Sequence, residues 1–452
     1  MDPVALFHQV ATTVPAYSAF LAERGVDPAR VSTLDDFRRL PLTTKDDYTR
    51  RYPLPQLCRG GVIGDLIAVS SGSTGEPSFW PRTVADEQVV ADRFEEVFRD
   101  WFDAGSRRTL AVVCFALGTW VGGLFTVACC RHLAGRGYPV TVVAPGSDKG
   151  EILRVVPELA PHFDQVVLLG YPPFLKNVVD SGLPWSRWNV RLVTAGEVFS
   201  EEWRTLVAAR AGIDDPVRGI ASLYGTADAG VLGNETPLSV EIRRFLAGRP
   251  DTARELFGES RLPTLVQYDP RARFFEEHEG TLVFSGDNGI PLVRYHIGDE
   301  GGLVPYERML EFVRLHGFDP VHQGPARPFA YVFGRGHFTV SYYGANVYPE
   351  NIAVGLEQPS VSSLVTGKFV MEVVEDAHRD RQLTVTVELA PGEKPAEETV
   401  QQVGESLLAQ LLRLNSEFAH YVPGPRRMPF VRLREAGDPE YFPPGAKHRY
   451  TR

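Results

Sequence analysis

A Ser/Gly-rich loop near the N-terminus is the part of the sequence whose residue types most directly suggest chemistry. It reads Ser70-Ser71-Gly72-Ser73-Thr74-Gly75-Glu76-Pro77. The apolar run Ile67–Val69 predicts a short strand that leads into it. Glycines let a backbone approach a bound group closely, and hydroxyl and N–H groups can cradle phosphate oxygens. The loop matches neither a Walker loop nor a dinucleotide fingerprint, so it predicts another kind of phosphate site or, alternatively, a plain turn.

Four further segments combine glycines with carboxylate, aromatic and basic side chains. In chain order they are Thr194-Ala195-Gly196-Glu197, Ser222-Leu223-Tyr224-Gly225-Thr226-Ala227-Asp228, Tyr295-His296-Ile297-Gly298-Asp299, and Gly334-Arg335 with Tyr343-Gly344-Ala345-Asn346-Val347-Tyr348-Pro349-Glu350. With the Ser/Gly loop, this ordered set resembles the motifs of adenylate-forming enzymes, which include acyl-CoA synthetases, peptide-synthetase adenylation domains and luciferases. The segment Pro41–Pro53 is similar to the opening of the phenylacetate-CoA ligase branch. Several matches in order are far more specific than one short motif.

The resemblance implies that the protein binds ATP and activates a small carboxylic acid. Such an acid is ionised near neutral pH, so its attack on the α-phosphorus needs positioning and charge neutralisation rather than a general base. By this resemblance the Ser/Gly loop holds the β- and γ-phosphates, and Asp228 holds Mg²⁺, a hard cation that prefers oxygen ligands. The resemblance also implies that Tyr224 stacks on the adenine and that Gly196 and Glu197 lie beside it. Gly225 and Thr226 belong to the same implied ATP-binding set. Asp299, assisted by Arg335, is implied to bind the ribose.

The C-terminal segment Pro444–Arg449 resembles the late catalytic-lysine segment of the same family. Lys447 would bridge the substrate carboxylate and the α-phosphate; the alternative is a solvated basic tail. His337 lies near the expected hinge, where rotation of a small domain after adenylation would let a thiol attack. The phenylacetate-CoA ligase branch implies CoA as the acceptor, and a carrier-protein thiol or an amine, as in an amide synthetase, is the alternative.

Three positions depart from the family pattern. Glu76 stands where a lysine is usual, Ala227 stands where a threonine normally contacts phosphate, and Asp228 replaces a longer glutamate. Thr226 would compensate for Ala227, and Asp228 would reach the metal through water. These departures leave open a catalytically weakened nucleotide-binding protein.

Aromatic residues in the loops at the ends of predicted strands suggest an acyl pocket. They are Phe115, Trp120, Tyr171 and Phe174. Such a lining suits an aromatic or other small apolar acid. The alternative is that each side chain is an ordinary part of the core.

The elements that must position these residues alternate between strand and helix patterns. Strand-like runs are Thr109–Ala116, Tyr138–Ala144, Gln165–Gly170, Val190–Thr194 and Val217–Tyr224, and helix-like runs are Val84–Ala104, Val121–Leu133, Glu151–Leu159, Pro173–Val179 and Glu201–Arg210. This order predicts an α/β fold whose mostly parallel sheet is covered on both faces and binds ligands at the carboxyl ends of its strands. From Leu238 to Tyr306, short turn-rich strands predict an attached β-rich subdomain.

A smaller α+β unit is predicted at the C-terminal end. Its order is strand, helix, strand, strand, helix, strand, over Phe338–Tyr343, Pro349–Leu356, Ser363–Val374, Gln382–Leu389, Ala396–Leu414 and Pro429–Arg434. We therefore expect a large ATP- and acyl-binding domain over residues 1–334 and a small mobile lid domain over residues 335–452 that carries Lys447. A chain of 452 residues is long enough for this division.

The composition excludes some classes of function. The formal net charge is -10, so no global basic surface is expected to hold a nucleic acid. No run of about 20 uninterrupted apolar residues occurs, which predicts that no segment spans a membrane. The four cysteines match neither a zinc ribbon nor a disulfide framework and fit a reducing cytoplasm. The sequence decides neither which acid is used nor whether the protein forms a homodimer.

Overall fold

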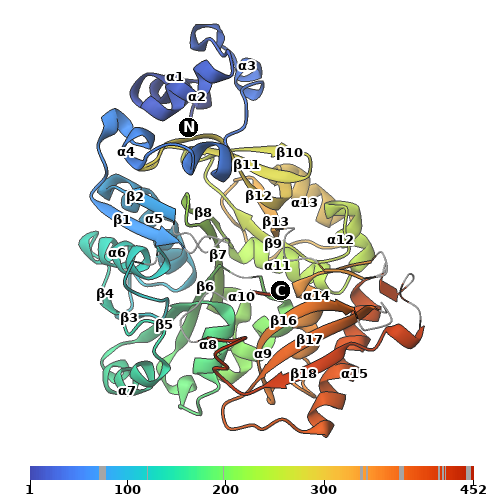
Figure 1. Cartoon of the computed structure of the whole chain (residues 1–452). Helices are drawn as coiled ribbons and strands as arrows, with labels where there is room; N and C mark the ends of the chain where they lie inside the picture. Colours follow the sequence, from blue (N-terminus) through green and yellow to red (C-terminus); the bar gives the residue numbers. More distant parts are fainter. Residues whose placement is uncertain are drawn as a thin grey trace.

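The chain folds into a large body that begins with N-terminal helices and a smaller C-terminal body beside it (Figure 1). The structure is a computed structural model. It describes residues 1–70, 78–119, 121–196, 198–335, 340–342, 345–375, 381–415, 418–419, 422, 424–443 and 449–451. Within these residues, no helix is long and apolar enough to cross a membrane.

One 11-stranded sheet organises the large body, in the order β10-β11-β12-β13-β9-β8-β7-β6-β5-β3-β4. Its parallel half consists of β3 (Thr109–Val113), β4 (Val140–Val143), β5 (Gln165–Gly170), β6 (Val190–Ala195) and β7 (Ile220–Thr226). The antiparallel half consists of β8 (Gly230–Asn234), β9 (Thr264–Gln267), β10 (Phe274–His278), β11 (Thr281–Gly286), β12 (Leu292–Val304) and β13 (Phe329–Arg335). The predicted α/β fold is confirmed.

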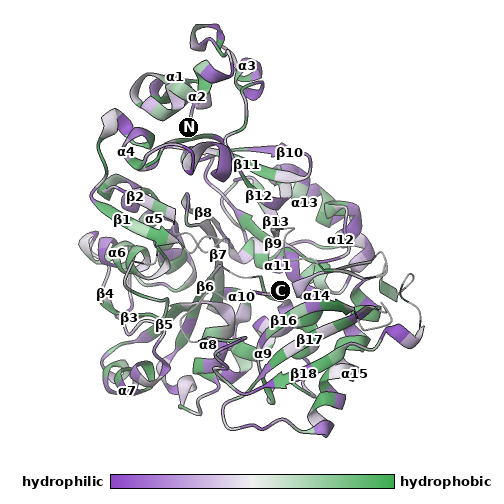
Figure 2. Cartoon of the chain, viewed as in Figure 1, coloured by the Kyte–Doolittle hydropathy of each residue, from purple (hydrophilic) through white to green (hydrophobic). Residues whose placement is uncertain are grey.

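Helices cover both faces of the parallel half, which is why most residues of its strands are apolar (Figure 2). Within β3, Ala111 and Val113 pack in the cluster that contains α5 and α6, whereas Leu110 and Val112 pack in the cluster of α7, α8 and α9. These helices are α5 (Val84–Glu96), α6 (Val121–Gly135), α7 (Lys149–Leu159), α8 (Pro172–Val179) and α9 (Glu201–Ala211). The carboxyl ends of the strands therefore open at one edge, where loops can form a site.

Three predicted elements are corrected. The β-rich region is no separate subdomain, because β7 pairs antiparallel with β8 and the strands that follow extend the same sheet. The region also begins with helices α11 (Pro237–Ala247) and α12 (Pro250–Phe257). Residues 217–219 lie in the short helix α10 (Pro216–Gly219) rather than in a strand. The expected helix Val84–Ala104 ends as α5 at Glu96 and continues as a wider π turn, Val97–Trp101, that buries its aromatic side chains.

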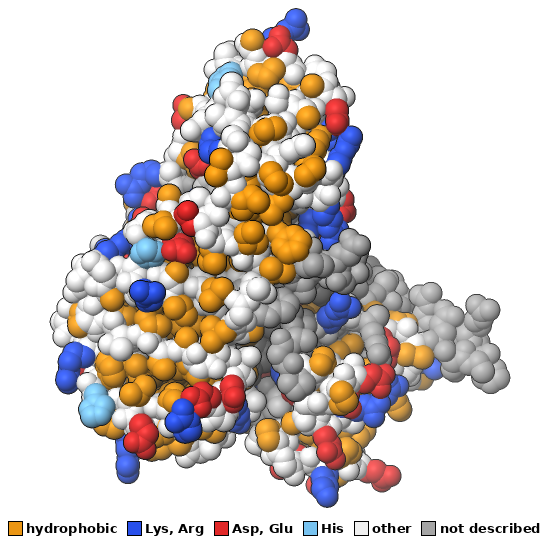
Figure 3. Space-filling model, turned by 60° about the vertical axis from the view of Figure 1, so that its left-hand side comes forward, with side chains coloured by type: hydrophobic (Ala, Val, Ile, Leu, Met, Phe, Trp, Pro, Cys, Tyr) orange, Lys and Arg blue, Asp and Glu red, His pale blue; other side chains and the backbone are white. Residues whose placement is uncertain are grey.

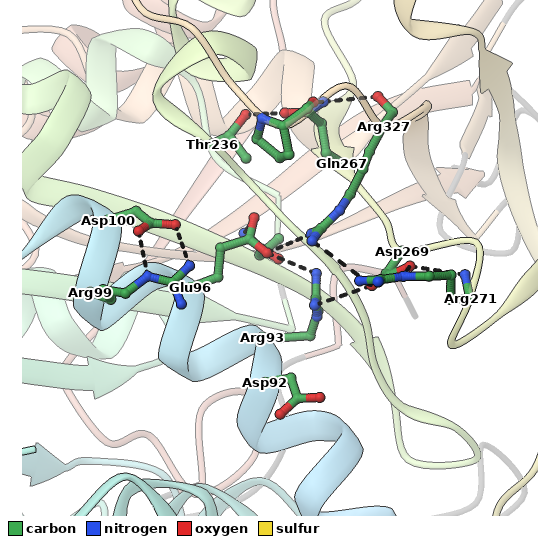
Figure 4. A network of polar contacts seen from close by, with 12 residues as sticks. Asp92, Arg93, Glu96, Arg99, Asp100, Thr236, Gln267, Asp269, Arg271 and Arg327 are labelled. Atoms are coloured by element: carbon green, nitrogen blue, oxygen red, sulfur yellow. Dashed lines mark hydrogen bonds and ion pairs between the residues drawn. The ribbon is translucent and has the colours of Figure 1, made fainter. Parts of the chain in front are cut away.

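A buried ion-pair network fixes α5 against the antiparallel half of the sheet (Figure 4). Arg93 and Arg327 both contact Glu96, at 2.9 Å and 2.6 Å, and both lie within 4 Å of Asp269. Arg271 pairs with the same Asp269 at 2.8 Å and, with the neighbouring charges, lowers its pKa to about 2. The buried carboxylates of Glu96 and Asp269 are therefore paired with arginines. Such pairing is needed because an unpaired buried charge is strongly destabilising.

The N-terminal helices pack over the β11–β12 side of the sheet. They are α1 (Pro3–Thr13), α2 (Pro15–Glu23), α3 (Leu34–Arg38) and α4 (Leu54–Leu57), followed by the hairpin of β1 (Leu66–Ser70) and β2 (Ser78–Arg82). Phe7, Tyr17, Phe20 and Tyr48 join the cluster that contains Tyr295 of β12. After α3 the chain reaches the sheet, where Thr43 forms a bridge to Tyr295.

The smaller body has its own sheet and core. It consists of the hairpin β14 (Val340–Tyr342) and β15 (Ala345–Val347), helices α14 (Pro349–Leu356) and α15 (Glu397–Leu414), and the sheet β16-β17-β18 (Val365–Glu375, Arg381–Leu389, Phe430–Arg434). Its apolar side chains form a separate cluster. Arg335, which the prediction placed first in the small domain, is the last residue of β13 in the large sheet.

Candidate active site

A cavity of about 670 Å³ lies at the carboxyl ends of the parallel strands and extends between the two bodies. The large body lines it with residues from α5, α6, β7, β8 and β12 and from the loops after β3, β5 and β6. The smaller body contributes Tyr348, Pro349, Glu350, Thr366, Lys368, Phe442, Pro443 and Tyr450. Its volume lies in the range of pockets that hold small molecules and cofactors.

Most of the predicted site residues that the structure describes share this cavity. They are Phe115, Tyr171, Phe174, Gly196, Tyr224, Gly225, Thr226, Asp228 and Asp299. These residues come from five segments that are far apart in the sequence: those that follow β3, β5 and β6, the end of β7 with its turn, and β12. The sequence predicted their types, and the fold brings them to one place.

Two tyrosine–aspartate pairs connect β7 and its following turn to β12. The Tyr224 hydroxyl donates to Asp299 Oδ2 at 2.8 Å, and the Tyr295 hydroxyl donates to Asp228 Oδ2 at 2.5 Å. The β7 segment therefore supplies the donor Tyr224 and the acceptor Asp228, and the β12 segment supplies the donor Tyr295 and the acceptor Asp299. All four side chains are at least nine-tenths buried, and phenol-to-carboxylate bonds of this kind hold the carboxylates in fixed orientations.

The N-terminal segment holds Tyr295 in place. Thr43 N–H donates to the Arg294 carbonyl at 3.0 Å, and His296 N–H donates to the Thr43 carbonyl at 2.8 Å. The Thr43 hydroxyl also donates to the Val293 carbonyl at 2.9 Å. The segment similar to the opening of the phenylacetate-CoA ligase branch thus acts here as an extra backbone partner for the strand that carries Tyr295 and Asp299.

Arg82 is a charged residue near the site that the sequence reasoning missed. It ends β2, is 1% exposed, and donates to the Ala227 carbonyl in the turn before Asp228. Burial lowers the pKa of the guanidinium, and the nearby Asp86 and Asp228 oppose that shift. No sequence pattern marks this residue, because its role depends on where β2 meets the turn after β7.

Glycine is required at the strand end next to the predicted adenine position. Gly196 has φ +83°, and a Cβ there would lie 2.8 Å from the Tyr171 ring. Tyr171 in turn packs edge-on against Phe115, with ring centroids 4.9 Å apart. A larger residue at position 196 would be strained and would displace this aromatic wall.

Other predicted site residues lie outside the described part of the chain. They are Ser71, Gly72, Ser73, Thr74 and Gly75 of the Ser/Gly loop, Glu76, Trp120, Glu197, His337 and Lys447, together with the side chains of Ser70 and Arg335. The described neighbours Val69, Val121, Gly196, Val198, Gly334 and Pro443 line the cavity. The backbone of Arg335 is described and pairs with Asp299 across β12 and β13.

The two bodies meet in a polar contact beside the cavity. Lys176 of α8 donates to the carbonyls of Ser362 and Val365 at 3.1 Å and 3.3 Å and pairs with Asp180 at 3.0 Å. The Ser200 hydroxyl donates to Glu357 at the end of α14. Desolvation raises the pKa of the Glu357 carboxyl to about 7, so this contact is sensitive to protonation.

Asp228 fits a metal ion that is held jointly with a nucleotide. The described residues contain no group of three or more histidine, cysteine or acidic side chains that could ligate a metal. Mg²⁺ commonly binds through one or two carboxylates together with phosphate oxygens and water. Asp228 is a single buried carboxylate that lines the cavity, which suits that mode. Its Oδ2 accepts the hydrogen bond from Tyr295, and its Oδ1 takes no part in that bond.

Sequence relatives support the resemblance first seen in the motifs. The chain is 22% identical over 395 residues to the phenylacetate-coenzyme A ligase of Aromatoleum evansii, covering 84% of this chain and 78% of that protein. It is 26% identical over 358 residues to the phenylacetate-coenzyme A ligase of Thermus thermophilus, covering 77% and 72%. No model of a known protein family matches the sequence.

Solved structures show the same fold. A 2-hydroxyisobutyryl-CoA ligase in its postadenylation state, in complex with 2-HIB-AMP, aligns with a TM-score of 0.63 at 14% identity, covering 99% of this chain and 87% of that one. The same ligase in its thioesterification state, with 2-HIB-AMP and CoA, gives 0.53, with 99% and 88% covered. The chain therefore shares the fold of this CoA ligase. The two sequence relatives named above are both phenylacetate-coenzyme A ligases, to which this chain is similar.

Proposed function

We propose that this protein is an ATP-dependent, adenylate-forming ligase that activates a small carboxylic acid and transfers the acyl group to CoA. The observation that carries the proposal is the pairing of Tyr224 with Asp299 and of Tyr295 with Asp228 on one cavity. It connects the predicted ribose-binding and metal-binding carboxylates in a single buried unit. The relatives named as phenylacetate-coenzyme A ligases support the same reaction class.

In the first step, a carboxylate oxygen of the acid forms a bond to the α-phosphorus of ATP while the bond to pyrophosphate breaks. Asp299 accepts hydrogen bonds from the ribose, and the Tyr224 ring lies against the adenine. Asp228 would hold Mg²⁺, which would supply positive charge against the phosphates when bound. Lys447 bridges the substrate carboxylate and the α-phosphate. No side chain has to remove a proton from the acid, because carboxylic acids ionise well below neutral pH.

In the second step, a thiol sulfur attacks the acyl carbon and AMP leaves, while the thiol proton passes to solvent or buffer. CoA is the acceptor favoured by the names of the sequence relatives. A carrier-protein thiol or an amine would use the same acyl-adenylate. A product assay with CoA and amines supplied together separates these acceptors.

The decisive experiment is carboxylate-dependent exchange of labelled pyrophosphate into ATP, measured with a panel of aryl and short-chain acids. We expect exchange with at least one acid, and CoA thioester formation when CoA is added. Asp299→Asn, which keeps the size of the side chain, should weaken ATP binding. Tight ATP binding by a folded protein without exchange for any acid would instead identify a catalytically weakened nucleotide-binding protein.

A further inference from the structure

One end of the cavity is apolar and lies between α5, α6 and the strands β7 and β8. Its lining is Phe94, Phe115, Val121, Phe125, Leu223 and Val231. Aromatic and aliphatic walls favour a flat apolar group, because burying such a group removes apolar surface from water on both sides. In the proposed function, this end holds the apolar part of the acid.

One face of α6 opens onto this end. Gly122 and Thr126 are four residues apart, so they lie one above the other on the same helical face, and both line the cavity. A Cβ at Gly122 would lie 3.5 Å from the Phe115 ring and from the Tyr171 hydroxyl. The missing side chain at Gly122 leaves room above Thr126. A bound ring can therefore approach the Thr126 hydroxyl.

Thr126 is a buried helical threonine whose hydroxyl lacks the local bond that other threonines of this chain make. It is 5% exposed, and its hydroxyl makes no hydrogen bond with any described residue. Elsewhere, Thr12 and Thr205 donate to the carbonyls of His8 and Glu201, each at 2.9 Å, one turn earlier in their helices. That local bond is the common way for a helical threonine to satisfy its hydroxyl. The Thr126 hydroxyl, which can both donate and accept, instead faces the cavity. A ligand there can form the hydrogen bond that the protein does not supply.

We infer that Thr126 is a specificity-determining residue that hydrogen-bonds an uncharged hydroxyl or amino substituent on the apolar part of the acid. This inference rests on the proposed function and narrows it to hydroxy- or amino-substituted aromatic acids. The substituent is uncharged because the residues around it in the apolar end are aromatic and aliphatic and would not solvate a second charge. A site built to pair such a group discriminates against an acid that lacks it, because the protein hydroxyl then stays unpaired.

The test compares matched acids in the pyrophosphate exchange assay, with benzoic and phenylacetic acids against their ring-hydroxylated and ring-aminated isomers. In the unaltered enzyme, at least one substituted isomer should exceed its parent in kcat/KM by about tenfold or more. Thr126→Val keeps the branched shape and removes the hydroxyl, and it should abolish that preference without lowering kcat/KM for the parent acid. Thr126→Ser, which restores a hydroxyl, should retain the preference.

The control variant is Thr205→Val, which removes a helical hydroxyl that is already bonded within α9 and does not line the cavity. It should leave the preference unchanged. Because selectivity is a ratio measured within one variant, partial loss of folded enzyme does not alter it. Robust exchange with the same preference in Thr126→Val overturns the inference and leaves the proposed function intact. Absence of exchange with every acid overturns both.

Discussion

The Tyr295 hydroxyl lies 2.5 Å from Asp228 Oδ2 and donates a hydrogen bond to it. Tyr295 is fully buried and is held by the Thr43 bridge, so it restricts the orientation of the carboxylate. We expect Tyr295→Phe to slow adenylate formation about tenfold or more and to raise the Mg²⁺ concentration needed for half-maximal exchange, because a hydrogen bond to a charged group contributes about 1.5–3 kcal/mol.

The matched control is Tyr224→Phe, which removes the companion bond to Asp299. It should raise the KM for ATP and leave the Mg²⁺ dependence nearly unchanged. Titration of Mg²⁺ at saturating ATP distinguishes the two variants. An unchanged Mg²⁺ dependence in Tyr295→Phe would refute a positioning role for this tyrosine.

Lys447 is predicted to act in the first step only. Lys447→Ala should abolish carboxylate-dependent pyrophosphate exchange, because nothing else in the proposal bridges the acid and the α-phosphate. It should largely spare thioester formation from supplied acyl-adenylate and CoA. Single-turnover assays of each half-reaction provide the comparison, and equal loss of both steps contradicts the assignment.

Protonation of Glu357 should favour the present arrangement of the two bodies. Its carboxyl has an ordinary pKa of 4.5, and desolvation in the contact raises that pKa to about 7. The docked arrangement therefore binds the proton more tightly than an arrangement in which Glu357 meets water. Docking is most favourable below the ordinary pKa, weakens as the pH rises from about 4.5 to about 7, and is independent of this group above that range.

Energy transfer between dyes on the two bodies, measured from acidic to neutral pH, reports this dependence. Glu357→Gln cannot ionise and should remove most of it. Glu398→Gln, which alters an exposed glutamate of α15 in the same body, should not. A pH response that persists unchanged in Glu357→Gln rules out Glu357 as its source.

A buried ion pair next to β7 should matter for stability. Arg204 and Glu235 are almost fully buried and contact each other at 2.7 Å, and Glu235 also accepts from Ser222 N–H at 2.9 Å. Glu235→Ala leaves the guanidinium without this partner and should lower the free energy of unfolding by about 3–5 kcal/mol. Urea unfolding measures the change. The control Arg108→Ala breaks an exposed pair with Asp164 and should have no measurable effect.

Local sequence patterns were enough for the elements whose apolar spacing is regular. The strand Gln165–Gly170 and the helix Pro349–Leu356 have the predicted bounds. Helix α11 was missed although its signal was present: Thr236 forms a capping box with Ser239, and Leu238, Ile242, Phe245 and Leu246 follow at helical spacing. The extent of the sheet was also missed, since antiparallel pairing between β7 and β8 depends on contacts that no local pattern encodes.

The sequence by itself determined the family resemblance, the types of the predicted site residues and their order. It could do so because glycines, carboxylates and aromatic residues at fixed spacings are the residue types that suit binding of a nucleotide's phosphates, ribose and base. Only the tertiary structure decided that Tyr224 pairs with Asp299 and Tyr295 with Asp228, that Arg82 reaches the turn before Asp228, and that the Thr126 hydroxyl faces a cavity. These relations join strands and helices far apart in the chain. They depend on how the sheet aligns its strand ends. Burial then strengthens each hydrogen bond, because the dielectric constant of the protein interior is lower than that of water.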